Sequence, residues 1–252
     1  IHDPDEKWPD IRLYKDIAND GGQVFPGFHV HHNSGACDVE QWLKHREHFE
    51  TAKVAAFEDT GEYAYTAGDC TRSYAPKKAS CVTRQIVFVR PGTFVIFDRV
   101  TSTNAAFKKT LLFQPMQVPQ GGGSRWTVTN GKGRLFIETV LPRQPVVKVL
   151  TGPEQYGYGG RMFPPQGNTG PAPECRMEIS PSAPAQADYF LHVLTATDAG
   201  VAQAPQASLV ENEHEVSVTI GDASLCFLKK ELGGSVVLHG KRRELARSAP
   251  EL

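Results

Sequence analysis

The densest group of potential metal or sugar ligands in the chain lies at residues 28–33, which have the sequence Phe-His-Val-His-His-Asn. In an extended segment His29 and His31 would share one face, because side chains alternate along a strand. Two imidazoles on one face could begin a zinc site, which needs at least one further ligand. The spacing selects no third ligand from the candidates nearby, Cys37, Asp38, His45 and His48. Exposed loop histidines and sugar contacts are the alternatives, so we take His31 and His32 as candidate substrate-binding residues and predict no metal and no cofactor.

Tyrosine and arginine side chains supply a second candidate set, which suits an acidic sugar. Tyr65 and Arg72 flank a short turn, whereas Tyr156 and Tyr158 lie in a Gly/Pro-rich segment at residues 151–174. Aromatic side chains offer a stacking surface, and guanidinium groups pair with carboxylates through two hydrogen bonds. We therefore predict that these four residues bind substrate, with structural tyrosines and a mobile loop as the alternatives. We assign no catalytic residue.

A charged pair follows the most apolar strand of the sequence. Asp98 and Arg99 come directly after Phe-Val-Ile-Phe at residues 94–97. Alternation sends one of the two charges inward, where a buried charge needs a partner such as Arg84 or Arg90. We predict a structural ion pair here and not a catalytic group.

Composition predicts a soluble, all-β chain. The 252 residues carry a formal net charge of −1, which gives no electrostatic footprint for nucleic acid or an anionic membrane. The 23 Gly and 18 Pro are spread along the chain and favour short strands joined by turns. No stretch approaches the roughly 20 apolar residues of a membrane-spanning helix. The motifs GxSxG, GK[ST] and HExxH are absent, as is a GxGxxG between a strand and a helix.

The elements that must position these residues form an antiparallel two-layer β-sandwich in our prediction, with one short helix within residues 39–49 and the long Gly/Pro-rich loop. The opening segment 3–28 has turn chemistry and is predicted as loop. We predict one domain over residues 1–240 and a polar tail at 241–252. The predicted strands are 53–57, 63–67, 82–90, 93–100, 108–114, 125–130, 133–141, 146–150, 176–180, 188–197, 207–211, 214–220, 223–229 and 234–239.

Five cysteines leave the redox compartment open. Their spacing matches neither a zinc-binding CxxC pair nor a dense disulfide framework. Buried thiols are expected for most of them, and Cys70 and Cys81 would form a bridge between neighbouring strands only in an oxidising compartment. The five are Cys37, Cys70, Cys81, Cys175 and Cys226.

An ordered set of strings resembles the C-terminal β-domain of the heparinase II/III-like polysaccharide lyases over about residues 1–230. The strings are IHDPDE from Ile1, NDGGQ from Asn19, AFED from Ala56, YAY from Tyr63, GD at Gly68, RQIVF from Arg84, FVIFDRV from Phe94 and FLHVL from Phe190. The resemblance implies a two-part enzyme that cleaves uronate-containing polysaccharides by β-elimination, with an N-terminal α/α toroid, a β-sandwich and a cleft between them.

The resemblance also implies that the catalytic residues lie elsewhere. In such lyases the tyrosine and one histidine come from the toroid, and the histidine-rich motif and metal-binding residues of the sandwich precede the segment that matches Ile1. His31 and His32 do not match that motif, so we carry over no catalytic position. We expect this chain to be the sandwich part of a longer secreted or periplasmic lyase, inactive alone, with an acidic polysaccharide and the upstream toroid as partners.

Two other functions compete with this interpretation. A non-catalytic carbohydrate-binding or structural sandwich would explain the tyrosines and arginines without a catalytic set. A metal-dependent hydrolase would use the His29 and His31 pair. A sandwich separated from its toroid would also expose an apolar face, so we predict either self-association into a homo-oligomer or a partner chain.

Overall fold

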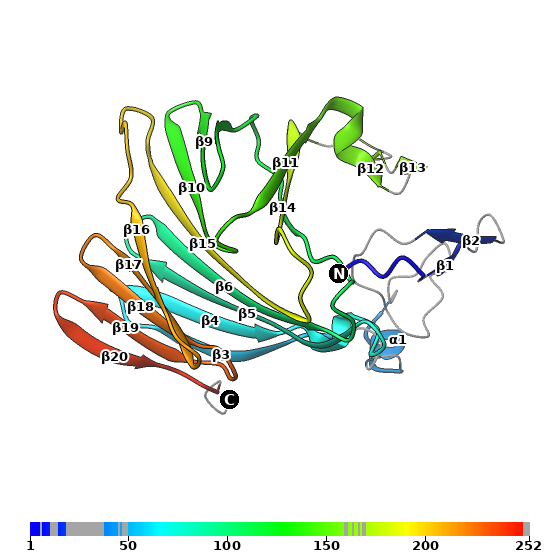
Figure 1. Cartoon of the computed structure of the whole chain (residues 1–252), viewed down its shortest axis with the longest axis horizontal. Helices are drawn as coiled ribbons and strands as arrows, with labels where there is room; N and C mark the ends of the chain where they lie inside the picture. Colours follow the sequence, from blue (N-terminus) through cyan, green and yellow to red (C-terminus); the bar gives the residue numbers. More distant parts are fainter. Residues whose placement is uncertain are drawn as a thin grey trace.

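The computed structural model describes residues 1–5, 7–10, 15–18, 38–44, 46, 50–158, 161–162, 164–165, 167 and 170–248. These residues form an all-β sandwich of antiparallel sheets, which confirms the predicted fold class (Figure 1). The α-helix among them, α1 at Val39–Lys44, lies within the predicted helical segment. No helix in the described ranges is long and apolar enough to cross a membrane.

The largest sheet has eight strands in the order β3-β4-β5-β6-β15-β10-β9-β8. Its strands are β3 (Lys53–Asp59), β4 (Tyr63–Asp69), β5 (Ala79–Val89), β6 (Thr93–Ser102), β8 (Gln120–Gly122), β9 (Arg125–Asn130), β10 (Gly133–Leu141) and β15 (Ala187–Asp198). The β5–β6 hairpin is the predicted one, with Phe88 directly opposite Phe94. We call this sheet the large sheet.

The second layer is a five-stranded sheet in the order β16-β17-β18-β19-β20. Its strands are β16 (Ala207–Glu211), β17 (Glu215–Ile220), β18 (Ala223–Leu228), β19 (Gly234–Leu238) and β20 (Lys241–Leu245). The main core lies between this layer and the large sheet, with Phe97 stacked on Phe227 at 5.0 Å between ring centroids. We call this side of the large sheet the core face.

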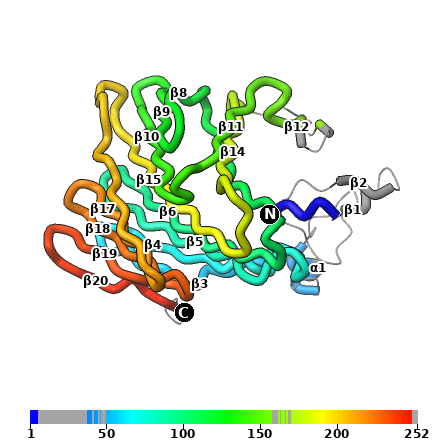
Figure 2. The backbone as a smooth tube through the Cα atoms, in the orientation of Figure 1, coloured from blue at the N-terminus to red at the C-terminus, as the bar shows by residue number. Residues whose placement is uncertain are grey.

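A third, smaller sheet covers part of the opposite side of the large sheet, which we call the pocket face. It has the order β11-β14-β7, from β7 (Leu111–Phe113), β11 (Val146–Thr151) and β14 (Cys175–Ser180). Ile179 of β14 packs with Phe190 and Val100, and Met177 packs with Ile137. The five-stranded and three-stranded sheets therefore lie on opposite sides of the large sheet (Figure 2). The prediction of two layers lacked this third sheet.

Strand β5 shows why the sequence produces two different faces. Gln85 and Val87 are buried on the core face, whereas Arg84, Ile86 and Phe88 alternate with them on the pocket face. Successive side chains point to opposite sides of a strand, so the position of Arg84 in β5 places its charged side chain on the pocket face.

Two predictions about irregular segments are wrong. The opening was predicted as loop, but Lys7–Asp10 (β1) pairs with Lys15–Ala18 (β2). The tail was predicted to begin at Lys241, but Lys241–Leu245 forms the edge strand β20, with Leu245 buried in the main core. The Gly/Pro-rich segment contains η2 (Gly152–Tyr156), β12 (Gly157–Tyr158) and β13 (Arg161–Met162), and the turn after β4 contains η1 (Thr71–Ser73).

Candidate functional site

A pocket of about 500 Å³ opens where the large sheet meets the three-stranded sheet and the N-terminal residues. One wall comes from the pocket face, with Arg84 on β5, Asp98 on β6 and Phe190 on β15. The other wall comes from β7, β14 and η2, and His2 and Lys108 complete the lining. His2 is fixed there because its backbone N–H donates to the carbonyl oxygen of Lys108 at 2.8 Å.

An ion pair across the β5–β6 hairpin forms part of the first wall. Arg84 and Asp98 lie directly opposite each other, and Nε and Nη2 of Arg84 donate to the two carboxylate oxygens at 2.7 and 2.8 Å. These bonds raise the pKa of Arg84. Burial raises the pKa of Asp98, and the bonds from Arg84 oppose that shift. The ion pair predicted for Asp98 is thereby confirmed, with Arg84 as the partner; Arg90 pairs with Asp59 instead.

A second pair holds η2 against β14 in the other wall. Arg176 donates to the backbone oxygens of Gln155 and Gly157 at 2.7 and 2.8 Å, and its Nη2 lies 2.9 Å from Glu178. Both charged side chains are nearly buried, at 13% and 11% exposure. The guanidinium therefore ties the loop that carries Tyr156 to the sheet, and Tyr156 lines the pocket.

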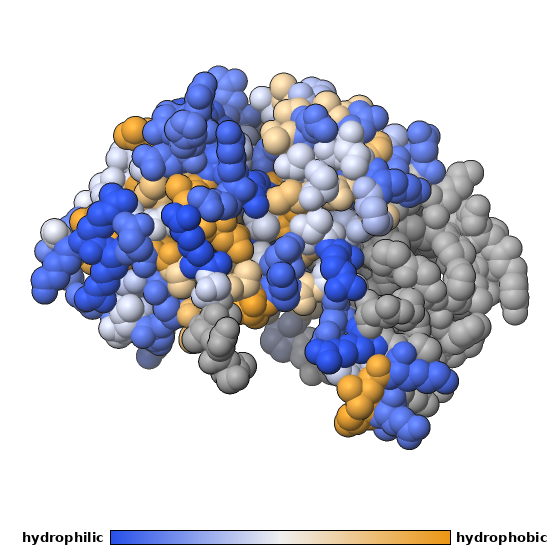
Figure 3. Space-filling model, turned by 90° about the horizontal axis from the view of Figure 1, so that it is seen from below, coloured by the Kyte–Doolittle hydropathy of each residue, from blue (hydrophilic) through white to orange (hydrophobic). Residues whose placement is uncertain are grey.

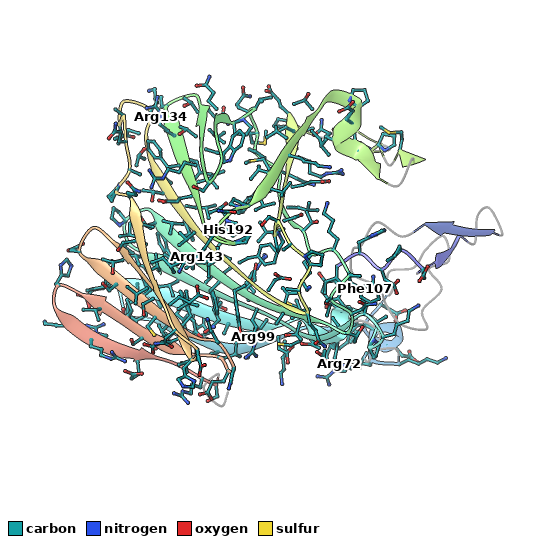
Figure 4. All side chains as sticks on the ribbon, viewed as in Figure 1. Arg72, Arg99, Phe107, Arg134, Arg143 and His192 are labelled. Carbon is teal, nitrogen blue, oxygen red and sulfur yellow. The ribbon has the colours of Figure 1, made fainter. Side chains whose placement is uncertain are left out.

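Two further charged or titratable groups are buried at the pocket: Lys109 is one of the lining residues, and His192 lies behind them. Lys109 is 2% exposed and its Nζ lies 2.9 Å from Asp188 Oδ2, so its charge is neutralised inside the protein. His192, labelled in Figure 4, is fully buried between the large sheet and β7, edge-on to Phe113 at 5.3 Å. Its Nδ1 lies 3.2 Å from Thr139 Oγ1, and burial lowers its pKa to about 3. His192 is therefore a neutral core residue, and it is not among the lining residues.

The three predicted substrate-binding residues whose side chains the structure describes, Tyr65, Arg72 and Tyr156, do not come together. Of the six, Tyr156 lines the pocket. Tyr65 is 1% exposed on the core face, where its hydroxyl donates to Gln85 Oε1 at 2.7 Å, so we assign it a structural role. Arg72 lies in η1 and does not line the pocket, although Tyr74 two residues later does. His31, His32 and the side chain of Tyr158 lie outside the described residues.

The sequence analysis missed most of the pocket. Arg84 was named there as a partner for Asp98, and register could have placed it on the pocket face. Lys108 and Arg176 belong to no motif, and only the folded chain brings them to the pocket. Within the described ranges no three His, Cys, Asp or Glu side chains are grouped as metal ligands, and the four described cysteines, Cys70, Cys81, Cys175 and Cys226, are free.

Several solved structures are similar to this chain, although no protein-family model and no curated protein matches the sequence. Heparan sulfate lyase HepC from Pedobacter heparinus matches with a TM-score of 0.50 and 14% identity, over 80% of this chain and 28% of that chain. A structure of heparinase III matches at 0.47 and 12%, over 78% and 27%. A heparinase III gene product, BT4657, matches at 0.44 and 16%, over 92% and 34%.

The match to HepC places this fold among those found in heparinase-type polysaccharide lyases, which confirms the predicted resemblance at the level of fold. The chain spans less than a third of HepC.

Proposed function

We propose that this chain is the β-sandwich part of a polysaccharide lyase that cleaves uronate-containing polysaccharides by β-elimination, in which it supports an upstream α/α toroid and lines the substrate cleft. The observation that carries the proposal is the fold shared with HepC over 80% of this chain but only 28% of the lyase. Such a function would place the protein outside the cytoplasm, secreted or periplasmic.

The chemistry of β-elimination explains why a sandwich alone would be insufficient. The reaction needs a group that neutralises the uronate carboxylate, a base for the C5 proton and an acid for the leaving oxygen. Three of the cations at the pocket, Arg84, Lys109 and Arg176, already pair with carboxylates of this chain. In the proposed enzyme the base and the acid come from the toroid, as the resemblance to such lyases implies, and the sandwich contributes a wall.

Exposed apolar side chains support a packing role for the pocket face. Phe57 of β3 is 54% exposed and Phe94 of β6 is 38% exposed, and Phe94 stacks on Phe88 at 4.4 Å. By strand register all three belong to the pocket face. Figure 3, the view from below, shows a separate area of hydrophobic surface on a different side of the molecule, near its middle. Apolar surface of this kind is typical of an interaction site.

A lyase assay tests the proposal. The chain alone, and the chain joined to or mixed with its toroid, would be incubated with heparan sulfate, hyaluronan and alginate, and unsaturated products followed by ultraviolet absorbance. Activity only in the presence of the toroid is the expected result. Turnover by the chain alone would overturn the supporting role, and no turnover by the combined protein would overturn the lyase assignment in favour of a carbohydrate-binding module.

A further inference from the structure

The 3-10 helix η2 forms part of the pocket wall without burying a side chain of its own. None of its residues, Gly152–Tyr156, is buried, although Gln155 and Tyr156 line the pocket. Its N-terminal end at Thr151 also lacks a side-chain cap. Because apolar burial is the main favourable contribution to folding, a segment without it opens at a lower free energy than the strands beside it. The position of η2 therefore depends on polar contacts.

Arg176 of β14 supplies two of these polar contacts. Its Nη1 donates to the carbonyl oxygen of Gln155 at 2.7 Å, and its Nη2 donates to that of Gly157 at 2.8 Å. The same Nη2 lies 2.9 Å from Glu178 Oε1, on the same face of β14. A planar guanidinium presents its donors in a fixed fork, so one side chain bonds two carbonyl oxygens of the loop and a carboxylate of the strand at once.

A glycine at each end allows η2 to turn as a unit. Gly152 follows β11 with a φ of +55° and open space around it, and Gly157 is the C-cap of η2. Thr151, the last residue of β11, pairs with Cys175 of β14, so the strand pairing ends directly before Gly152. A few residues at the ends of an element can absorb a change in backbone dihedral angles. A rotation at these two glycines would therefore move η2 while β11 and β14 stay paired.

The contact between Arg176 and η2 also carries a cost. Nε of Arg176 is buried and has no hydrogen-bond partner among the residues that the structure describes. A buried donor without an acceptor disfavours the state in which water cannot reach it. The unbonded Nε therefore narrows the free-energy difference between η2 in its present position and η2 turned outward.

We propose that η2 is a movable wall of the pocket and that Arg176, with Glu178 as its counter-ion, is the positioning residue that holds this wall closed. When the contact breaks, Gln155 and Tyr156 leave the lining and the pocket widens on the side of the three-stranded sheet. The inference goes beyond the proposed function, because it concerns the wall and holds for any ligand of the pocket. In Figure 1 the segment is the coiled turn between β11 and β12.

Hydrogen exchange of the whole chain, followed by mass spectrometry, tests the movement. In the wild-type protein we expect the amides of residues 154–157 to exchange at a rate that low urea concentrations leave unchanged, because η2 opens locally. Arg176→Lys keeps the positive charge beside Glu178 but lacks the fork of donors. This variant should raise the exchange rate of η2 about tenfold, as the loss of one hydrogen bond predicts, and leave that of β14 unchanged.

Arg134→Lys is the matched control, because Arg134 of β10 also donates to a backbone oxygen in a loop, that of Val201. This variant should leave the exchange of η2 at the wild-type rate. An η2 that exchanges together with β14 in every variant would show that it opens only with the sheet, and an unchanged rate in Arg176→Lys would show that Arg176 does not hold it. Either result would overturn the proposal.

Thiol labelling tests whether the movement widens the pocket. Cys70 lines the pocket and Cys226 lies on the five-stranded sheet, and both are free and half-buried. We expect Arg176→Lys to raise the rate at which a bulky maleimide labels Cys70 about tenfold, in step with the opening of η2, and to leave the labelling of Cys226 unchanged. Peptide mass mapping assigns the label. No change at Cys70, or an equal increase at both thiols, would contradict a wall that moves on its own. Neither experiment uses a substrate, so both outcomes are independent of the lyase assay.

Discussion

Tyr65 and Gln85 are joined by a 2.7 Å hydrogen bond in the core between the large sheet and the five-stranded sheet. The same oxygen of Gln85 accepts the backbone N–H of Gly233 at 2.8 Å, from the turn between β18 and β19. Gln85 is 2% exposed, so water does not reach this site. Its side-chain oxygen is therefore the acceptor for two buried donors, one from the large sheet and one from the five-stranded layer. Burial raises the pKa of Tyr65, which keeps the hydroxyl protonated and able to donate.

Replacing the acceptor should therefore destabilise the sandwich more than removing one donor. We expect Gln85→Leu to lower the free energy of unfolding by about 2 to 4 kcal/mol, because two buried donors lose their partner. Tyr65→Phe should cost only about 1 kcal/mol, since Gly233 keeps its bond. Urea denaturation at constant m-value measures both. Equal losses in the two variants would contradict a shared acceptor.

The Arg84–Asp98 pair gives a pH-dependent prediction. In Arg84→Met the buried Asp98 keeps the burial that raises its pKa and loses the bonds that oppose it. A carboxyl group with a folded pKa above its unfolded value favours folding at low pH and loses that contribution as the pH rises. We therefore expect the variant to be about 1 to 3 kcal/mol less stable than wild type at pH 7, and the deficit to shrink toward pH 4.

Denaturation of both proteins at pH 4, 5.5 and 7 checks this dependence. Arg90→Met is the control, because Arg90 pairs with the exposed Asp59. Its effect should be small at every pH. A deficit of Arg84→Met that is independent of pH would show that Asp98 remains ionised without its partner.

Most strands of this fold could be predicted from the sequence, because each has a local pattern of apolar residues bounded by turn residues. The predicted bounds of β9, β10 and β16 agree with the structure. Strand β20 was missed because its sequence is Lys-Arg-Arg-Glu-Leu, in which only Leu245 is buried. An edge strand with one face in solvent needs few apolar residues, so composition makes it look like a polar tail.

The pocket could not be predicted in the same way. Alternation in β4 separates Tyr65 from Thr66, but it does not say which side of the strand faces the core, since sheets lie on both sides of the large sheet. The lining residues come from strands and turns as distant as His2 and Phe190. Only the pairing of β6 with β15, which places Asp98 opposite Phe190, brings such residues together.

The burial of His192 predicts that the stability of the protein falls on acidification. Its folded pKa of about 3 lies below the ordinary histidine value of 6.5, so between these values the unfolded state binds a proton that the native state does not. Stability is therefore complete above pH 6.5 and falls on acidification, by at most ~1.4 kcal/mol per pH unit from this group. His192→Phe should remove that part of the slope between pH 4 and 6. His214→Gln, at an exposed site, should keep the wild-type slope; unchanged slopes in both variants would contradict a buried neutral His192.

Gly234 marks the tightest backbone contact among the described glycines. It has φ +144°, and a Cβ placed there would lie 1.8 Å from the carbonyl oxygen of Cys226 on the neighbouring strand. The obstacle is a backbone atom, so no change of rotamer relieves the collision. We therefore expect Gly234→Ala to lower the free energy of unfolding by more than about 3 kcal/mol or to prevent folding.

Gly131→Ala is the matched control, because Gly131 has φ +57° and open space around its Cβ position. That variant should cost only roughly 1 kcal/mol, the strain of a left-handed residue. Thermal melts of the two variants distinguish steric collision from conformational preference, and comparable losses would mean that β18 and β19 can separate to accommodate a methyl group.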